Sequence, residues 1–145
     1  MKSITRKRIL ITAVSVLLII ALLIVWYFIP VKLLKINAED IEKITVFDGG
    51  RGIETEFTAR EDIEYLTENL SSVTMKRDGI SLGYSGYSFR TTVYLKNGSE
   101  KSFIINGEDS VRDDPFFYKV TEGRIDYKFI ENRINAQYEN DGNQR

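Results

Sequence analysis

The sequence contains one uninterrupted apolar run, Ile9 to Ile29, which constrains the fold more than any other feature. The run holds no charged residue. As a helix rising 1.5 Å per residue, such a segment extends about 30 Å, the thickness of the hydrocarbon core of a bilayer. It is apolar on all sides and long, as a membrane span requires. We therefore expect a transmembrane helix over residues 9–29.

Charged and aromatic residues flank this run asymmetrically. Four basic side chains and no acidic one precede it. Basic residues mark the cytoplasmic side of a membrane helix, and Trp and Tyr favour the membrane–water interface. We therefore predict a single-pass protein of the cell membrane, with residues 1–8 as a cytoplasmic tail and the C-terminal domain outside. The residues predicted at the membrane interface are Trp26, Tyr27, Lys32 and Lys35.

Two alternatives concern this N-terminal part. A cleaved signal peptide has an apolar region of about 7–15 residues that ends in small residues. This run is longer and ends in Trp-Tyr-Phe-Ile-Pro, so a permanent anchor is favoured. Residues 30–40 then form a juxtamembrane linker. Its apolar side chains either dip into the lipid headgroups or begin the soluble domain, and the pattern leaves both open for Leu33, Leu34 and Ile36.

Cysteine and histidine are both absent from the sequence, and this absence excludes much chemistry. No disulfide, thiolate nucleophile, Cys/His zinc site or Ser/His/Asp triad can form. From Lys32 onward the chain has 16 basic and 21 acidic residues, a net charge of −5. Nucleic acid is disfavoured as a partner because phosphate binding needs clustered Lys and Arg. We predict no catalytic residue, no cofactor and no metal site.

Residues 41–138 are predicted to form one extracytoplasmic domain of the α+β class. Two β-branched runs around Asp48-Gly49-Gly50-Arg51-Gly52 indicate a hairpin. Residues 58–70 predict a helix, with Thr58 and Glu61 as a capping box at its start. The apolar stripe of this helix consists of Ile63, Leu66 and Leu70.

A second hairpin is predicted over residues 87–105, with its turn at Asn97-Gly98. A three-residue loop fits better than a two-residue turn, because it places the apolar residues of both strands on one face. A strand at 116–120 follows, and after Gly123 the spacing of Tyr127, Ile130, Ile134 and Tyr138 predicts a C-terminal helix. Residues 139–145 are predicted to be disordered. These elements predict an antiparallel sheet with a capped helix and a C-terminal helix packed on it.

The stretch from Gly79 to Arg90 is the first candidate binding site. Its glycines have the spacing G-x-x-x-G-x-x-G, which differs from the dinucleotide fingerprint, and a strand follows instead of a helix. Nucleotide binding is therefore disfavoured. Tyr and Arg are enriched in protein interfaces, so Tyr84, Tyr87 and Arg90 are the residues predicted to bind a partner. The alternative, which we favour, is a loop with a structural role only.

The second candidate is the acidic segment Glu108–Asp114, whose carboxylates suggest a Ca²⁺ site. It lacks the EF-hand pattern and contains Arg112, so a solvated turn is favoured. A pair of carboxylates for glycoside cleavage is the remaining enzymatic option. The sequence gives no separation between carboxylates, and it defines no oligomeric state.

The layout as a whole resembles that of small single-span proteins of unknown function in Gram-positive bacteria. The likeness rests on the basic segment "KSITRKR", the anchor, the cysteine-free tail and the hairpin "YSFRTTVYLKNGSEKSFII". It implies a surface-facing, membrane-anchored domain. Two functions follow as hypotheses: a non-catalytic interaction or sensor-accessory module that meets another membrane or cell-envelope protein, and a carboxylate-dependent cell-envelope hydrolase.

Overall fold

The structure, a computed structural model, describes residues 2–142, with side-chain surroundings for residues 6–139. It contains a long helix α1 (Lys2–Phe28), a 3-10 helix η1 (Ala38–Asp40), and the helices α2 (Arg60–Ser72) and α3 (Tyr127–Gly142). The strands of the described residues are β1 (Val31–Lys32), β2 (Ile41–Asp48), β3 (Ile53–Phe57), β4 (Thr74–Ile80), β5 (Phe89–Leu95), β6 (Glu100–Ile105), β7 (Ser110–Asp113) and β8 (Phe116–Glu122).

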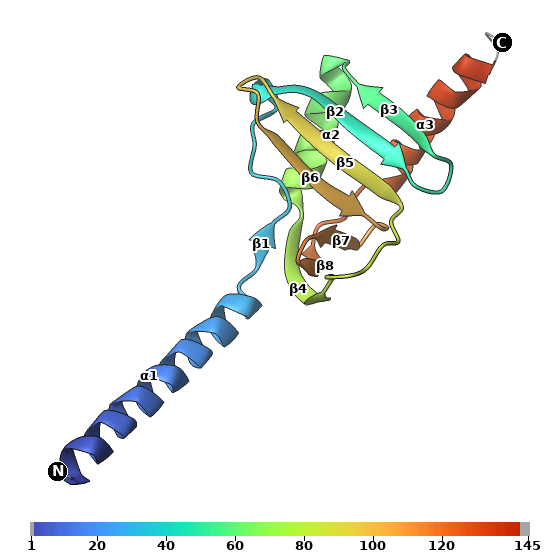
Figure 1. The fold of residues 1–145 in the computed structure, drawn as a ribbon. Helices are drawn as coiled ribbons and strands as arrows, with labels where there is room; N and C mark the ends of the chain where they lie inside the picture. Colours follow the sequence, from blue (N-terminus) through green and yellow to red (C-terminus); the bar gives the residue numbers. More distant parts are fainter. Residues whose placement is uncertain (1, 143–145) are drawn as a thin grey trace.

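These strands form one eight-stranded antiparallel sheet in the order β1-β4-β8-β7-β6-β5-β2-β3. The helices α2 and α3 pack on one face of it, and the other face is open (Figure 1). The predicted α+β class with an antiparallel sheet is therefore confirmed. The strands β1 and β4 lie beside the end of α1, whereas β3 forms the far edge (Figure 1).

The core lies between the sheet and its two helices. Alternate residues of the central strands, such as Ile44 and Val46 on β2 and Val93 on β5, are fully buried on this side. The predicted apolar stripe of α2 packs on them, together with Ile130 and Ile134 of α3. Burial of these apolar surfaces provides the main driving force for folding of the domain.

Helix α2 begins differently from the prediction. Its N-cap is Ala59, in an extended conformation, and no side chain caps it. The predicted capping box of Thr58 and Glu61 is therefore wrong. The reason is that β3 keeps its pairing with β2 as far as Phe57, so the chain turns into the helix one residue later than the capping box requires. Arg60 pairs with Glu64 across the first turn instead.

Both predicted hairpins are present. In the second, Thr91 faces Phe103 and Phe89 faces Ile105, which is the register of a three-residue loop. The strand expected at 116–120 is β8. Helix α3 continues to Gly142, so residues 139–142 of the predicted disordered tail are helical, and 143–145 lie outside the described residues.

Helix α1 has the length and composition that the sequence predicts. Its segment Arg6–Phe28 has 23 residues and none of its apolar window is buried by the rest of the chain. At 1.5 Å per residue this segment measures about 35 Å. One helix among the described residues is thus long and apolar enough to cross a membrane.

The segment that follows α1 belongs to the folded domain. Val31 and Lys32 form β1 and pair with Met75 and Thr74 of β4. Leu33 and Leu34 are each 1% exposed and lie in the hydrophobic core. These two leucines therefore do not dip into lipid headgroups; of the two alternatives, the start of the domain is the one observed. Only two residues, Ile29 and Pro30, separate α1 from the sheet.

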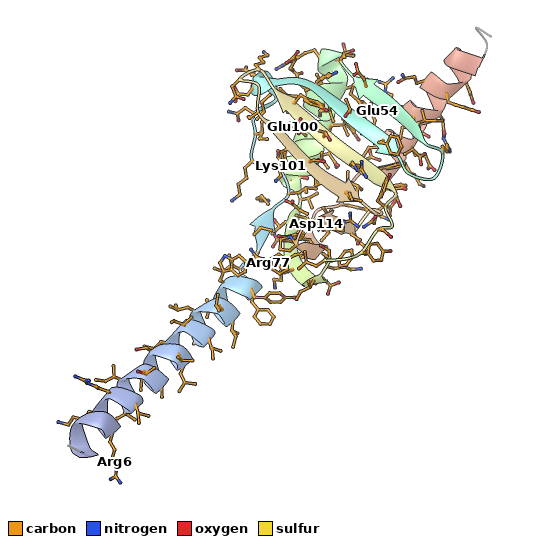
Figure 2. The ribbon with its side chains drawn as sticks, viewed as in Figure 1. Arg6, Glu54, Arg77, Glu100, Lys101 and Asp114 are labelled. Carbon is orange, nitrogen blue, oxygen red and sulfur yellow. The ribbon has the colours of Figure 1, made fainter. Side chains whose placement is uncertain are left out.

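A side chain from β4 closes the C-terminal end of α1. Arg77 donates from its Nη1 to the carbonyl oxygens of Trp26 at 2.9 Å and Tyr27 at 3.3 Å. Its guanidinium also stacks on the Trp26 ring, 3.9 Å from the centroid. A cation at this end satisfies free carbonyl groups and complements the helix dipole. Figure 2 shows Arg77 where α1 meets the domain, so hydrogen bonds join α1 and the domain.

The burial of the segment after α1 gives a test. Leu34→Ala should lower the free energy of unfolding of the full chain in detergent micelles by about 2–5 kcal/mol, because it opens a cavity in the core. The matched control is Lys35→Ala at the exposed neighbouring position, with an expected effect within about 0.5 kcal/mol. Denaturant titration followed by circular dichroism measures both. Equal midpoints for the two variants would show that this segment is only a tether.

Candidate functional site

One row of side chains crosses the open face of the sheet. The pairing register places its members opposite one another on adjacent strands, in the order Glu54, Phe47, Arg90, Ile104, Arg112 and Phe117. We call this set the cross-sheet row. Side chains directly opposite on neighbouring strands are in contact distance. The row begins at Glu54, on the edge strand far from α1 (Figure 2).

The centre of the row is buried although it lies on the face away from the helices. Ile104 is 6% exposed and Arg112 is 8% exposed. A buried arginine requires partners for its charge and its donors. The charge of Arg112 is paired, because its Nε lies 3.3 Å from Oδ1 of Asp114, although this Nε makes no hydrogen bond. Its Nη1 donates to the backbone of the segment that covers it.

That covering segment is residues 81–88, which connect β4 to β5; we call it the β4–β5 loop. The Nη1 of Arg112 donates to the carbonyl oxygens of Tyr84 at 2.8 Å and Gly86 at 3.2 Å. At one end of the loop Ser81 donates its hydroxyl to Asp114. At the other end, Ser88 accepts from the backbone N–H of Gly49 at 2.8 Å. The loop is therefore held at three points against the open face.

Two aromatic–arginine clusters result from this arrangement. In the first, the Arg90 guanidinium lies 4.5 Å from the centroid of the Tyr87 ring and 5.9 Å from that of Phe47. In the second, the Tyr84 ring packs edge-on against Phe117 at 5.2 Å, with Arg112 5.7 Å from the Tyr84 centroid. Such contacts between cations and ring faces are attractive.

The structure thus brings two of the three predicted partner-binding residues together. Tyr87 and Arg90 share the first cluster, whereas Tyr84 lies in the second and is exposed. The sequence analysis missed Phe47, Arg112 and Phe117. The alternation of side chains along β2 could have placed Phe47 on the open face, because its neighbour Val46 faces the core. Arg112 was missed because its strand, β7, was interpreted as an acidic turn.

A shallow groove lies between the two clusters. Its volume is about 360 Å³, and its lining includes Arg90, Ser102, Ile104, Arg112 and Asp114. Arg112 is paired with Asp114, so the positive charge at the mouth of the groove comes from the exposed Arg90. Flat aromatic groups beside an arginine can hold a planar or acidic side chain of a partner by stacking and hydrogen bonding.

The acidic segment Glu108–Asp114 is only in part the solvated turn that we favoured, because its residues Ser110–Asp113 form the strand β7, and ion pairs hold the acids of the bend before it. Glu108 pairs with Arg124, and Asp109 lies 2.6 Å from Nζ of Lys119. These carboxylates are already neutralised by cations. No group of three or more potential metal ligands occurs among the residues that the structure describes.

The neighbouring carboxylates Asp113 and Asp114 face different surroundings. Asp114 accepts from Ser81 and pairs with Arg112 on the open face. Asp113 lies with Lys101 and Tyr118 in a second hollow, of about 330 Å³, beside the segment after α1. Burial raises the pKa of Asp113, the Lys101 charge lowers it, and the Asp114 charge adds to the rise. Both carboxylates also line the groove of the open face, together with Arg112. They are consecutive in the chain, whereas glycoside cleavage uses two carboxylates on opposite sides of the scissile bond.

Of the predicted membrane-interface residues, the two aromatic ones lie at the end of α1. The Trp26 and Tyr27 rings pack edge-on against Phe116 of β8, with centroids at 5.9 and 6.1 Å. Lys32 donates to the carbonyl oxygen of Ser72 at 3.1 Å, and Lys35 is exposed beside it. Trp26 and Tyr27 thus lie where the helix enters the domain, whereas Lys32 and Lys35 follow on the chain as it runs away from α1; contact of these residues with lipid stays a prediction.

Comparison of the chain with models of protein families, with curated proteins and with solved structures finds no match in any of the three. The geometry of the open face and of the junction with α1 is therefore what indicates a function for this chain.

The role of Arg112 in holding the β4–β5 loop gives a second test. Arg112→Lys keeps the charge but loses the paired donors, and a hydrogen bond from a charged group contributes about 1.5–3 kcal/mol. Amide exchange at Tyr84, whose N–H donates to Ser81 at 3.0 Å, should therefore accelerate by roughly tenfold or more. Hydrogen-exchange mass spectrometry measures this. Arg60→Lys, in an exposed ion pair of α2, is the control; an unchanged rate at Tyr84 would mean that Arg112 does not hold the loop.

The raised pKa of Asp113 gives a third test. The folded protein binds the proton of this carboxyl more tightly than the unfolded chain, so Asp113 costs stability as the pH rises above its ordinary pKa of 3.8. Asp113→Asn should therefore raise the urea midpoint at pH 7. The gain should disappear below the ordinary pKa, where both side chains are neutral. A gain that is equal at pH 3 and pH 7 would contradict this assignment.

Proposed function

We propose that the protein is a membrane-anchored interaction or sensor-accessory module without catalytic activity. In this proposal α1 spans the cell membrane once, residues 1–8 lie in the cytoplasm and the α+β domain lies outside. The domain binds another membrane or cell-envelope protein through the open face of its sheet. The cross-sheet row is the observation that carries the proposal.

The composition and rigidity of the open face support this choice. Tyr, Phe and Arg are enriched in protein interfaces and supply much of their binding energy. Here they come from β2, β5, β7, β8 and the β4–β5 loop, and the loop is bonded to the sheet through Arg112. A surface that is already ordered loses less conformational entropy on binding.

The direction of the open face favours a partner in the same membrane. The sheet has its first strands, β1 and β4, beside α1 and its last strand, β3, at the far edge, and Figure 1 views the open face while α1 runs across the view. The open face therefore points at right angles to α1. If α1 crosses the membrane, this face points parallel to the membrane surface. A neighbouring protein of the same membrane can therefore contact this face from the side.

The alternative of an envelope hydrolase has less support. Its nearest candidates, Asp113 and Asp114, face different partners, and Asp114 is bonded to Arg112 and Ser81. A carboxylate in this position is a structural acceptor. We therefore place the function in binding.

The orientation is tested by labelling of single cysteines, for which the chain is suited because it has none of its own. Lys128→Cys, at an exposed position of α3, should react with a membrane-impermeant maleimide on intact protoplasts. Lys7→Cys should react only after lysis. Labelling of position 7 on intact cells, with protection of position 128, would reverse the orientation.

The interaction surface is tested by photo-crosslinking in cells. A photoreactive residue at Tyr84 or Ser102, both exposed on the open face, should capture the same partner, and one at Lys128 should not. Arg90→Ala should weaken capture from Ser102 by roughly tenfold or more, because an arginine at the centre of an interface contributes about 2 kcal/mol. Arg133→Ala, on α3, should leave it unchanged. Capture that is equal from Lys128, or insensitive to Arg90→Ala, would contradict the proposal.

A further inference from the structure

Two aliphatic side chains at the start of the β4–β5 loop are unusually exposed. Ile80 is 69% exposed and Leu82 is 73% exposed. Beyond Ile29, they are the exposed large aliphatic residues of the described chain; the others exposed there are tyrosines. Contact of exposed aliphatic side chains with water is unfavourable unless another surface covers them, and exposed apolar patches mark interaction sites.

The direction of β4 brings these side chains to the level of the end of α1. β1 runs away from α1, and β4 is antiparallel to it, so β4 runs back toward α1 from Met75 onward. Arg77 already reaches the carbonyl groups of Trp26 and Tyr27. Ile80 lies three residues further along the strand, about 10 Å at the rise of a β-strand. Figure 1 shows the end of β4 beside the end of α1.

Contacts between rings connect the patch to the anchor. Ile80 is paired with Phe116 across the sheet, and Phe116 packs against both Trp26 and Tyr27. Trp and Tyr at the end of a membrane helix lie at the headgroup level. The aliphatic patch is thus continuous with the aromatic end of α1.

The loop presents the patch in a fixed conformation. Leu82 and Gly83 occupy the tip of a turn that is closed by the N–H of Tyr84 donating to the carbonyl of Ser81. Gly83 has a φ of 82°, a conformation that glycine adopts without strain. Ser81 is itself bonded to Pro115 and Asp114. Leu82 is therefore held away from the domain by a short, anchored turn.

From this arrangement we propose that Ile80 and Leu82 are a second membrane-contact site, which enters the interfacial region of the outer leaflet beside α1. The proposal rests on the anchoring of α1 proposed above. The occupant is the lipid bilayer itself. The charges nearby are mixed, with Lys76 and Asp78 both exposed on β4, so the contact depends on apolar burial and not on anionic lipid.

The experiment uses the full chain in liposomes, with one cysteine labelled by an environment-sensitive fluorophore. Leu82→Cys reports the patch, Leu17→Cys reports the middle of α1, and Asn132→Cys, exposed on α3, is the control. Lipids carry a quencher either near the headgroups or near the bilayer centre. We expect the headgroup quencher to reduce the emission from position 82, and this emission to be shifted to the blue. The central quencher should reduce the emission from position 17. Neither quencher should reduce the emission from position 132.

The two proposals fail in different ways. If position 17 is quenched and position 82 is not, the second contact is wrong and the anchor stands. If position 17 is not quenched, both are wrong. Quenching of the emission from position 82 that requires anionic lipid and disappears at high salt would also overturn the proposal, because it would show an electrostatic contact.

Discussion

The contact between the end of α1 and strand β4 is the constraint on which the rest of the structure depends. Only Ile29 and Pro30 separate the helix from β1, and β1 is already part of the sheet. Arg77 then bonds the last carbonyl groups of the helix to the second strand of the sheet. With one short covalent connection and the hydrogen bonds of Arg77, the domain has little freedom to rotate relative to α1. The directions of the open face and of the Ile80–Leu82 patch follow from this.

The elements with local signals were predictable from the sequence. The hairpin at Asn97-Gly98 was predicted with its register, because the alternation of apolar residues on both strands allows only a three-residue loop to align Phe89 with Ile105. The stripe of α2 was equally clear. These patterns depend on residues close in the chain, which the sequence displays directly.

The parts that depend on distant residues were not predictable. Arg77 meets Trp26 across about fifty positions, and no spacing rule connects them. Arg112 joins the cross-sheet row only because β6 and β8 flank β7 and the β4–β5 loop crosses it, and without that topology it looked like one cation among acids. Leu33 and Leu34 were ambiguous because a lipid surface and a protein core both accept leucine. Gly49, in the turn between β2 and β3, also depends on a distant residue: a Cβ there would lie 2.6 Å from the carbonyl oxygen of Tyr87, so the absence of a side chain at Gly49 lets the β4–β5 loop pack against this turn.

Under the proposed function, the sideways direction of the open face has a consequence for how tightly this face needs to bind a partner. A partner confined to the same membrane searches a surface instead of a volume, and its effective concentration beside the face is high. A weak contact over a few hundred square ångströms is then enough to hold the pair together, whereas the same contact between two soluble proteins would dissociate at once. A face with one row of rings and arginines, and no deep pocket, is suited to reversible encounters in the plane of the membrane.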